Sequence, residues 1–174
     1  MFEIRTANKN EFERICLFYY SMIEDMQNNE YKPGWKKGIY PTTKLLRDSI
    51  NCGELFVGEL DGDIASAMIV NHQFNEGYHK VKWSIDADPL EITVIHALGV
   101  HPDFIGNGYA KEMVKEVLSL AIENKQRAVR LDVLEGNIPA EKLYTSLGFN
   151  YIDIIQMYYE DTGWTDFKLY EYTL

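Results

Sequence analysis

The chain has 174 residues, of which 46% are hydrophobic and 25% are charged. These values exclude a disordered chain, and the length suits one domain spanning residues 1–174. The formal net charge of −10 argues against binding to nucleic acids or anionic membranes. It is compatible with a cationic substrate such as an amine, although the commoner explanation is that many cytosolic proteins are simply acidic.

The sequence shows no pattern typical of a signal peptide, a membrane span or paired cysteines, and this bears on its compartment. It begins without an apolar segment behind basic residues, and no stretch reaches the roughly 18 apolar residues of a membrane span. Cys16 and Cys52 lie far apart and form no paired motif, which is typical of free thiols in a reducing compartment. We therefore expect a cytoplasmic protein with no membrane partner.

The first half of the chain predicts two helices and a hairpin. Residues 2–5 form a short strand, and apolar residues recur at helical spacing from Phe12 to Met26, after a cap at Asn8 or Asn10. The aromatic loop 31–41 is expected either to line a site or to pack into the core. A second helix begins at Thr42 or Thr43, and strands 55–60 and 64–70 flank an Asp-Gly turn.

The second half predicts alternating strands and helices. Residues 81–85 alternate like a short edge strand, and a buried strand covers 92–100. A helix starting near residue 110, a strand at 128–134, a helix capped by Asn137 and two aromatic strands (151–159 and 165–172) follow. Hairpins followed by strand–helix units predict an α/β fold with a mixed sheet.

A glycine-rich turn follows the buried strand, whose one polar side chain from Val94 to Val100 is His96. Gly106 and Gly108 allow a close backbone approach to a ligand, and the unpaired amides of the next helix favour an anion. The turn lacks the Gly-Lys-Ser/Thr of a P-loop, and Lys111 occupies the third small position of the dinucleotide motif. We interpret the turn as a pyrophosphate cradle.

Two motifs between residues 91 and 149 resemble the GNAT superfamily of acyl-CoA-dependent N-acyltransferases. The turn Ile105-Gly106-Asn107-Gly108-Tyr109-Ala110 matches the family pattern Gln/Arg-x-x-Gly-x-Gly/Ala after an apolar strand. A second family element reads Asn137, Ala140, Leu143, Tyr144, Gly148 and Phe149. Ile105 replaces the family's leading Gln or Arg, which removes a side-chain contact to the phosphates and leaves the backbone cradle.

The resemblance implies a GNAT-like fold, with a central, mostly antiparallel sheet of six or seven strands flanked by about four helices. It implies acetyl-CoA as co-substrate and acetyl transfer to a primary amine of a small molecule or peptide, by direct attack in a ternary complex. The cofactor contacts that it implies are Leu98, Gly99, Val100, Ile105, Gly106, Asn107, Gly108, Tyr109, Ala110 and Asn137.

Three residues are the first candidates for catalysis. Tyr144 matches the family's tyrosine that protonates the departing thiolate, although its helical face also suits packing. His96 is in step with Leu98 on the strand and titrates in a suitable range, although a core histidine is the alternative. Glu91 competes with His96 as general base, because a bulge at Gly99 would exchange the strand faces.

Asp132 and Glu135, at the end of the next strand, are further candidate bases. The histidines and cysteines show no metal-ligand spacing, so we expect no metal. The alternative function is a non-catalytic acyl-CoA-binding or sensor module. The aromatic C-terminal hairpin suggests a homodimer edge.

Overall fold

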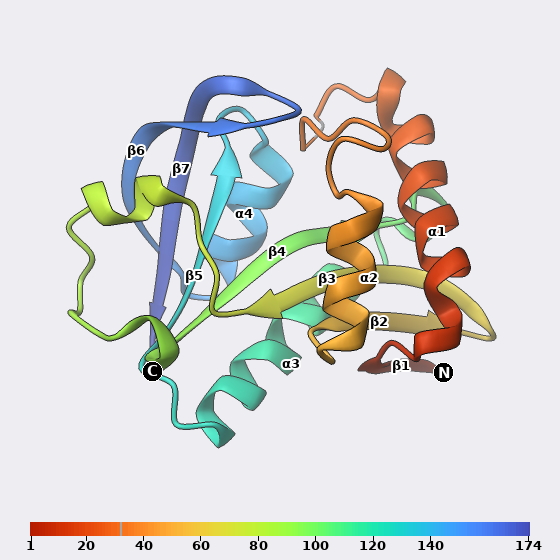
Figure 1. Cartoon of the computed structure of the whole chain (residues 1–174), viewed down its shortest axis with the longest axis horizontal. Coiled ribbons are helices and arrows are strands. Elements are labelled where there is room, and N and C mark those ends of the chain that lie inside the picture. Colours follow the sequence, from red (N-terminus) through yellow and green to blue (C-terminus); the bar gives the residue numbers. More distant parts are fainter. Residues whose placement is uncertain (32) are drawn as a thin grey trace.

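The computed structural model of the chain describes residues 1–31 and 33–174 (Figure 1). Lys32, which belongs to the predicted aromatic loop, lies outside the described residues. Within this part of the chain, seven strands form one sheet in the order β1-β2-β3-β4-β5-β7-β6. The strands are β1 (Phe2–Thr6), β2 (Leu55–Leu60), β3 (Asp63–Asn71), β4 (Ile92–Val100), β5 (Ala128–Leu134), β6 (Asn150–Tyr159) and β7 (Gly163–Thr173).

Neighbouring strands are antiparallel except for the central pair, β4 and β5, which are parallel. This arrangement confirms the predicted mixed, mostly antiparallel sheet. The β2–β3 hairpin turns at Asp61 and Gly62, whose φ angles of 52° and 96° are those of the tight turn that an Asp-Gly pair favours.

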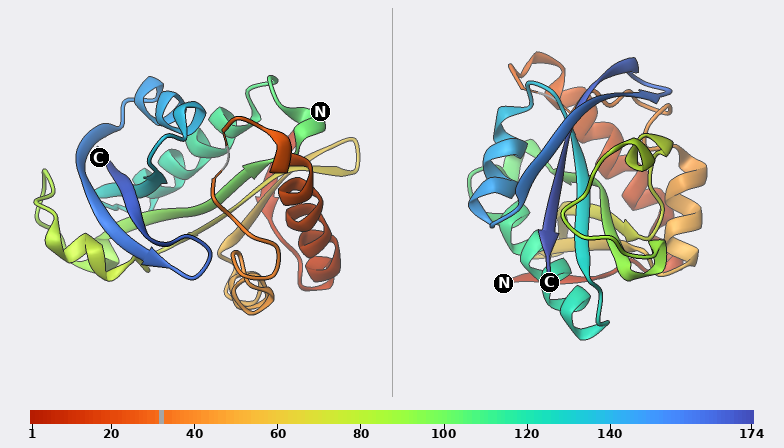
Figure 2. Two further views of the ribbon diagram at one scale, coloured as in Figure 1. Left: turned by 90° about the horizontal axis from the view of Figure 1, so that it is seen from above. Right: turned by 90° about the vertical axis from the view of Figure 1, so that its left-hand side faces the viewer.

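Four α-helices in the described residues cover the two faces of the sheet. They are α1 (Phe12–Asp25), α2 (Thr43–Asn51), α3 (Tyr109–Glu123) and α4 (Ile138–Ser146). Helices α1 and α2 lie on one face and α3 and α4 on the other (Figure 2). The side chain of Thr42 accepts a hydrogen bond from the Leu45 amide at 3.0 Å, which confirms one predicted cap.

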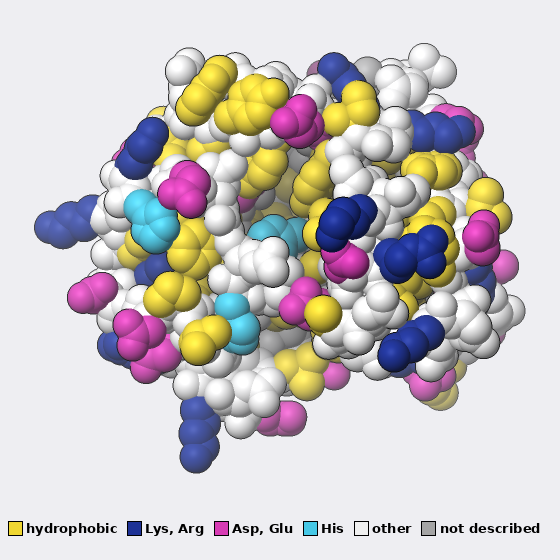
Figure 3. Space-filling view, viewed as in Figure 1, with side chains coloured by type: hydrophobic (Ala, Val, Ile, Leu, Met, Phe, Trp, Pro, Cys, Tyr) yellow, Lys and Arg dark blue, Asp and Glu magenta, His cyan; other side chains and the backbone are white. Residues whose placement is uncertain are grey.

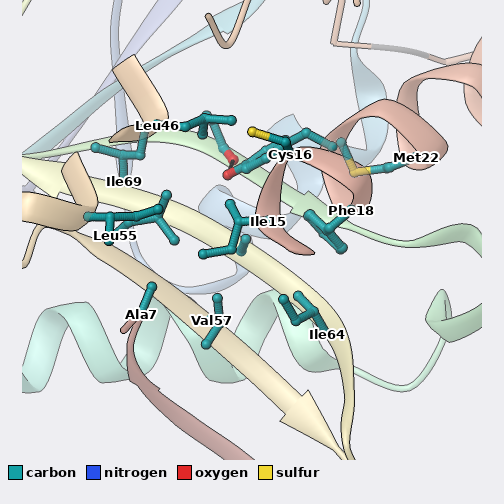
Figure 4. Packing of buried hydrophobic residues seen from close by; sticks show 14 of the residues in the cluster. Ala7, Ile15, Cys16, Phe18, Met22, Leu46, Leu55, Val57, Ile64 and Ile69 are labelled. Atoms are coloured by element: carbon teal, nitrogen blue, oxygen red, sulfur yellow. Dashed lines mark hydrogen bonds between the residues drawn. The ribbon is translucent and has the colours of Figure 1, made fainter. Parts of the chain in front are cut away.

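The two faces of the sheet have separate hydrophobic cores. On the first, side chains of α1 and α2 interlock with those of β2 and β3, as Figure 4 shows for Ile15, Met22, Leu46, Leu55 and Val57. On the second, α3 packs on β5 through Met113, Val117 and Leu131, among others. Because both faces are covered, the central strands are held firmly while their ends are free to shape a site.

The predicted edge strand at residues 81–85 is wrong. The segment between β3 and β4 folds as a 3₁₀ turn (Glu76–Lys80), irregular chain and a second 3₁₀ turn (Pro89–Glu91). The Trp83 indole donates to the Tyr78 carbonyl at 2.9 Å, and the Ser84 amide donates to the Glu171 carboxylate at 2.9 Å. The alternating pattern therefore reflects side chains that cover the sheet, since the backbone of this segment bonds to side chains and turns.

Strand β6 forms one edge of the sheet, and the hairpin to which it belongs exposes Tyr151, Tyr158 and Trp164. The predicted dimer edge at this place stays a prediction. In residues 1–31 and 33–174, no helix has the length and apolar character needed to cross a membrane.

Candidate active site

The central strands β4 and β5 separate and open the sheet. Residues 92–94 pair with residues 128–130, and beyond them the described strands pair no further. A β-bulge then places two residues of β4, Ala97 and Leu98, opposite the single residue Met68 of β3. Bulges bend a strand, so the second half of β4 turns away from β5 and borders a gap.

The bulge lies at Ala97, whose φ is 50°, rather than at Gly99 as the sequence analysis predicted. The Ala97 carbonyl accepts a hydrogen bond from the Tyr19 hydroxyl at 2.9 Å, which ties the bulge to α1. Gly99 is needed for packing instead, because a Cβ there would lie 2.5 Å from the sulfur of Met22.

The glycine-rich turn connects β4 to α3. Gly106 and Gly108 have φ angles of 89° and 83°, and a Cβ added at either would meet nothing within 4 Å. The glycines are therefore required by the left-handed backbone, and the space above them is open. Gly108 is the residue before α3, so the first amides of that helix have no helical partner and face an open surface.

Two contacts hold the turn in place. The Asn107 side chain donates to the Phe104 carbonyl at 3.0 Å, and the Tyr109 ring stacks on Phe2 of β1 at 4.2 Å between centroids. The preorganised amides favour an anion such as a phosphate, because they and the helix dipole present partial positive charge.

An open groove of about 330 Å³, which we call the outer groove, runs from this turn between β4 and α4. The residues predicted to contact a cofactor line it, except Asn107: they are Leu98, Gly99, Val100, Ile105, Gly106, Gly108, Tyr109, Ala110 and Asn137. Its walls are mostly apolar, and Lys111 adds a positive charge. An apolar channel that ends on unpaired amides fits a thioester carrier with a diphosphate.

A second hollow of about 100 Å³, the central cavity, lies in the gap between β4 and β5. It shares Leu98, Asn137, Ala140 and Tyr144 with the outer groove, and the loop residues Pro33 and Trp35 also border both. Pro33, Trp35 and Tyr40 of the aromatic loop line the cavity, and Trp35 and Tyr40 also pack against the core beneath α1 and α2, so the loop does both of the things expected of it.

Tyr144 stands in the shared wall of the groove and the cavity. Its ring packs edge-on against Phe149 at 5.5 Å, and its hydroxyl has no hydrogen-bond partner in the described part of the chain. Burial, with a smaller effect from the charge of Asp132, raises the pKa of Tyr144 well above its usual value. The hydroxyl therefore keeps its proton and is available as a donor.

Asp132 of β5 faces the central cavity. Its Oδ2 accepts hydrogen bonds from the hydroxyls of Tyr78 at 2.8 Å and Tyr159 at 3.0 Å. Burial raises the pKa of Asp132, and these two hydrogen bonds oppose the rise. The carboxylate is thus a stronger base than a solvated aspartate, and its Oδ1 has no partner among the described residues.

His96 of β4 lines the cavity as a neutral imidazole. Its Nε2 lies 2.9 Å from Oδ1 of Asn71, which also accepts from the Gln73 amide, while the Asn71 amide nitrogen donates to Glu54. Nε2 must therefore carry the proton. Burial lowers the pKa of His96 to about 4.

A third hollow of about 200 Å³, the front pocket, lies on the α2 face of the sheet. Tyr40, His96 and Tyr159 line both this pocket and the central cavity, so the two adjoin. Figure 3 shows this face hollowed near its centre, with hydrophobic side chains around the depression. The central cavity thus adjoins both the outer groove and the front pocket.

The profile of the acetyltransferase (GNAT) family matches residues 20–149. The chain belongs to the GNAT family. Members of this family use acetyl-CoA, and the geometry of the glycine-rich turn and outer groove fits that co-substrate.

Several N-acetyltransferases are similar in sequence to this GNAT chain. It is 30% identical over 93 residues to the [ribosomal protein bS18]-alanine N-acetyltransferase of Haemophilus ducreyi, an alignment that covers 53% of this chain and 64% of that protein. The chain therefore spans less than two thirds of that relative.

Solved structures share the fold along nearly the whole chain. A GNAT-family acetyltransferase from Streptococcus agalactiae superposes with a TM-score of 0.82 at 22% identity, covering 99% of this chain and 95% of that one. The Salmonella typhimurium protein yncA, solved with its cofactor acetyl-CoA, has a TM-score of 0.71 at 15% identity, covering 100% and 94%.

Two of the predicted bases lie away from the GNAT site. Glu91 belongs to a 3₁₀ turn at the far end of β4, where its carboxylate accepts from the Asp88 amide at 3.0 Å and lies 3.6 Å from Arg127. It lies outside the central cavity, because the cavity opens only where β4 has left β5, beyond residue 94. Glu135 is exposed and also lies outside the cavity.

Asp161 and Tyr159 also line the cavity, although no sequence motif marks either residue. Asp161 lies in the turn between β6 and β7 and is only 5% exposed. An Asp-Thr-Gly turn is ordinarily at the surface, so no local pattern marks it. Tyr159 was assigned only to an aromatic strand, yet it holds Asp132 and lines two hollows.

Proposed function

We propose that this protein is a single-domain N-acetyltransferase that transfers the acetyl group of acetyl-CoA to a primary amine by direct attack in a ternary complex. The observation that carries the proposal is the wall shared by the outer groove and the central cavity, which contains Tyr144. A thioester held in the groove and an amine held at Asp132 would meet at this wall.

The groove residues supply the binding of the co-substrate. The amides of the turn at Gly106 and Gly108 and the start of α3 would hold the diphosphate, and Lys111 would add charge. Residues Leu98 to Val100 would border the pantetheine arm, since β5 does not pair with them. When bound, acetyl-CoA supplies the activated acyl group.

Asp132 is the general base in this proposal. An alkylamine with a pKa near 10.4 is almost entirely protonated at pH 7, so it must lose a proton before it attacks. The free Oδ1 of Asp132 can accept that proton, directly or through water. His96 is assigned to positioning, because its Nε2 proton is committed to Asn71 and its pKa is about 4.

Tyr144 is the general acid. Its hydroxyl stays protonated at neutral pH, and it stands where the departing sulfur would lie at the junction of groove and cavity. Protonation prevents the thiolate from returning to the new amide. An amide of residues 98–100 would stabilise the oxyanion.

A non-catalytic acyl-CoA-binding module is not favoured. Such a module would need the outer groove alone, whereas this chain adds a cavity with a base and an acid beside the groove.

The experiment is an amine-panel assay that follows release of free CoA thiol, paired with thermal unfolding in saturating acetyl-CoA. We expect a concentration-dependent rise in Tm and CoA release that depends on one class of amine. A Tm rise without CoA release for any amine would support the binding module instead. No Tm rise would contradict the cofactor site.

A further inference from the structure

The charge of the central cavity is one-sided. Among the described residues that line it, the carboxylic acids are Asp132 and Asp161, and neither a lysine nor an arginine is present. His96 adds no positive charge, since its pKa is about 4. A cavity that is lined by carboxylates and lacks a resident cation favours a cationic occupant.

Asp161 is the acidic residue of this pair that the proposed acetyl transfer does not use. Its side chain is 5% exposed, and it forms no salt bridge with a residue that the structure describes. Burial raises the pKa of Asp161, opposed by backbone hydrogen bonds from its own turn and, more weakly, by the charge of Lys36. The hydrogen bonds to its own turn explain a polar side chain at this place but do not neutralise its charge. Burying a carboxylate is costly unless a cation pairs with it.

An aromatic wall joins the two carboxylates. Ring centroids lie 6.1 Å apart for Trp35 and Tyr40, and 6.2 Å apart for Tyr40 and Tyr159. Burial raises the pKa of Tyr40 well above its usual value, and the charges of Asp132 and Asp161 raise it further, so Tyr40 lies near both. Aromatic faces attract ammonium and guanidinium groups, particularly where water is excluded.

The size of the cavity limits the occupant. Its volume of about 100 Å³ is smaller than the roughly 150 Å³ of an engineered cavity that binds benzene, so it suits a short chain of a few heavy atoms. The adjoining front pocket leads toward it past Tyr40, His96 and Tyr159. A slender amine suits a path and a cavity of this volume.

Resting on the proposed function, we infer that the acceptor is a compact dication: a short alkyl diamine, or an alkylamine with a second cationic end. The reacting nitrogen lies at Asp132, and the second cation is held by Asp161 against the wall of Trp35 and Tyr40. Asp161 is then a specificity residue that binds substrate and takes no part in proton transfer.

The test compares 1,4-diaminobutane, n-butylamine, 4-aminobutanoate and a short peptide beginning with alanine as acceptors for the wild-type protein. We expect kcat/KM for the diamine to exceed that for butylamine by about tenfold or more, since one charge pair is lost. The amino acid is expected to be a still poorer acceptor, because its carboxylate would face Asp161.

The variant that isolates the second site is Asp161→Asn, with Glu160→Gln as the matched control. Glu160 is the exposed neighbour of Asp161, so its substitution removes the same charge outside the cavity. We expect Asp161→Asn to raise KM for the diamine about tenfold or more while kcat and the butylamine kinetics change less than about twofold. Glu160→Gln should leave both substrates unchanged.

The butylamine kinetics also report whether Asp161→Asn is folded and competent. Equal kcat/KM for diamine and butylamine, a peptide preferred over the diamine, or unchanged diamine KM in Asp161→Asn would each overturn the inference while acetyl transfer itself stood. Absence of CoA release with every acceptor would instead overturn the proposed function.

Discussion

Asp132 on β5 and Tyr144 on α4 line the same cavity, where burial and, to a smaller extent, the charge of Asp132 raise the pKa of Tyr144. A carboxylate on β5 and a protonated phenol on α4 thus border one cavity, and the phenol also lines the outer groove. One can accept a proton and the other can give one, which is the division of labour that acyl transfer to an ammonium substrate requires.

Tyr144→Phe removes the proposed acid and keeps the ring. We expect kcat to fall about 100-fold, because general acid catalysis contributes on that order, while the Kd for acetyl-CoA stays within about twofold. Stability should change little, since the hydroxyl has no hydrogen-bond partner among the described residues. Stopped assays and calorimetric titration measure the two constants, and an unchanged kcat would remove Tyr144 from the chemistry.

Asp132→Asn tests the base and its burial together. The folded pKa of Asp132 lies above its unfolded value near 3.9, so the stability it contributes is complete at low pH and is lost as the pH rises through the folded pKa. The neutral variant avoids that loss, so its Tm advantage over the wild type should grow from pH 4 to pH 8.

Asp132→Asn should raise the Tm but lower the activity. Wild-type activity should fall as the pH falls through the raised pKa, because the carboxylate gains a proton, and the variant should lose most activity at every pH. Retention of a wild-type acid limb in the pH–rate profile of Asp132→Asn would assign the base elsewhere.

His96→Gln separates positioning from base catalysis. Because burial lowers the pKa of His96 to about 4, its contribution to stability is present above its unfolded pKa near 6.5 and is lost as the pH falls from 6.5 to 4. The loss is of order 3 kcal/mol. Denaturant titrations of the glutamine variant should not show this loss of stability. Its kcat should fall less than about tenfold. A larger fall in kcat with a shifted pH–rate profile would identify His96 as the base.

Gly108→Ala tests the phosphate cradle, with Gly62→Ala as control. Both glycines have left-handed backbones with φ of 83° and 96°, and both have open space around an added Cβ, so each variant should lose about 1–2 kcal/mol of stability. Only Gly108 lies in the outer groove, so only its variant should bind acetyl-CoA about tenfold more weakly. If the two variants bound acetyl-CoA with equal affinity, the diphosphate would have to bind somewhere other than the turn.

The sequence revealed those parts of the site that depend on local geometry. Gly106 and Gly108 signal an open turn, and Asn137 signals the start of α4, because each has a conformation or cap that few other residues provide. The order of strands and helices followed from periodicity, and the two motifs placed Tyr144 beside the groove.

The remaining site residues depend on contacts between distant segments. Asp132 was only a lesser candidate, because its importance comes from Tyr78 and Tyr159, which are 54 and 27 residues away. Asp161 was hidden in an ordinary turn pattern. The bulge at Ala97 has no local signal, and Glu91 was misplaced because only the pairing of β4 with β5 shows where the cavity begins.

The most direct test of the account is mass-spectrometric detection of the acetylated amine together with CoA release, for the wild type and for Tyr144→Phe and Asp132→Asn. The account predicts stoichiometric monoacetyl product from an alkylamine with the wild type, and a loss of about 100-fold or more in both variants while each still binds acetyl-CoA. Equal product formation by all three proteins, or wild-type binding of acetyl-CoA with no acetylated amine from any acceptor, would contradict it.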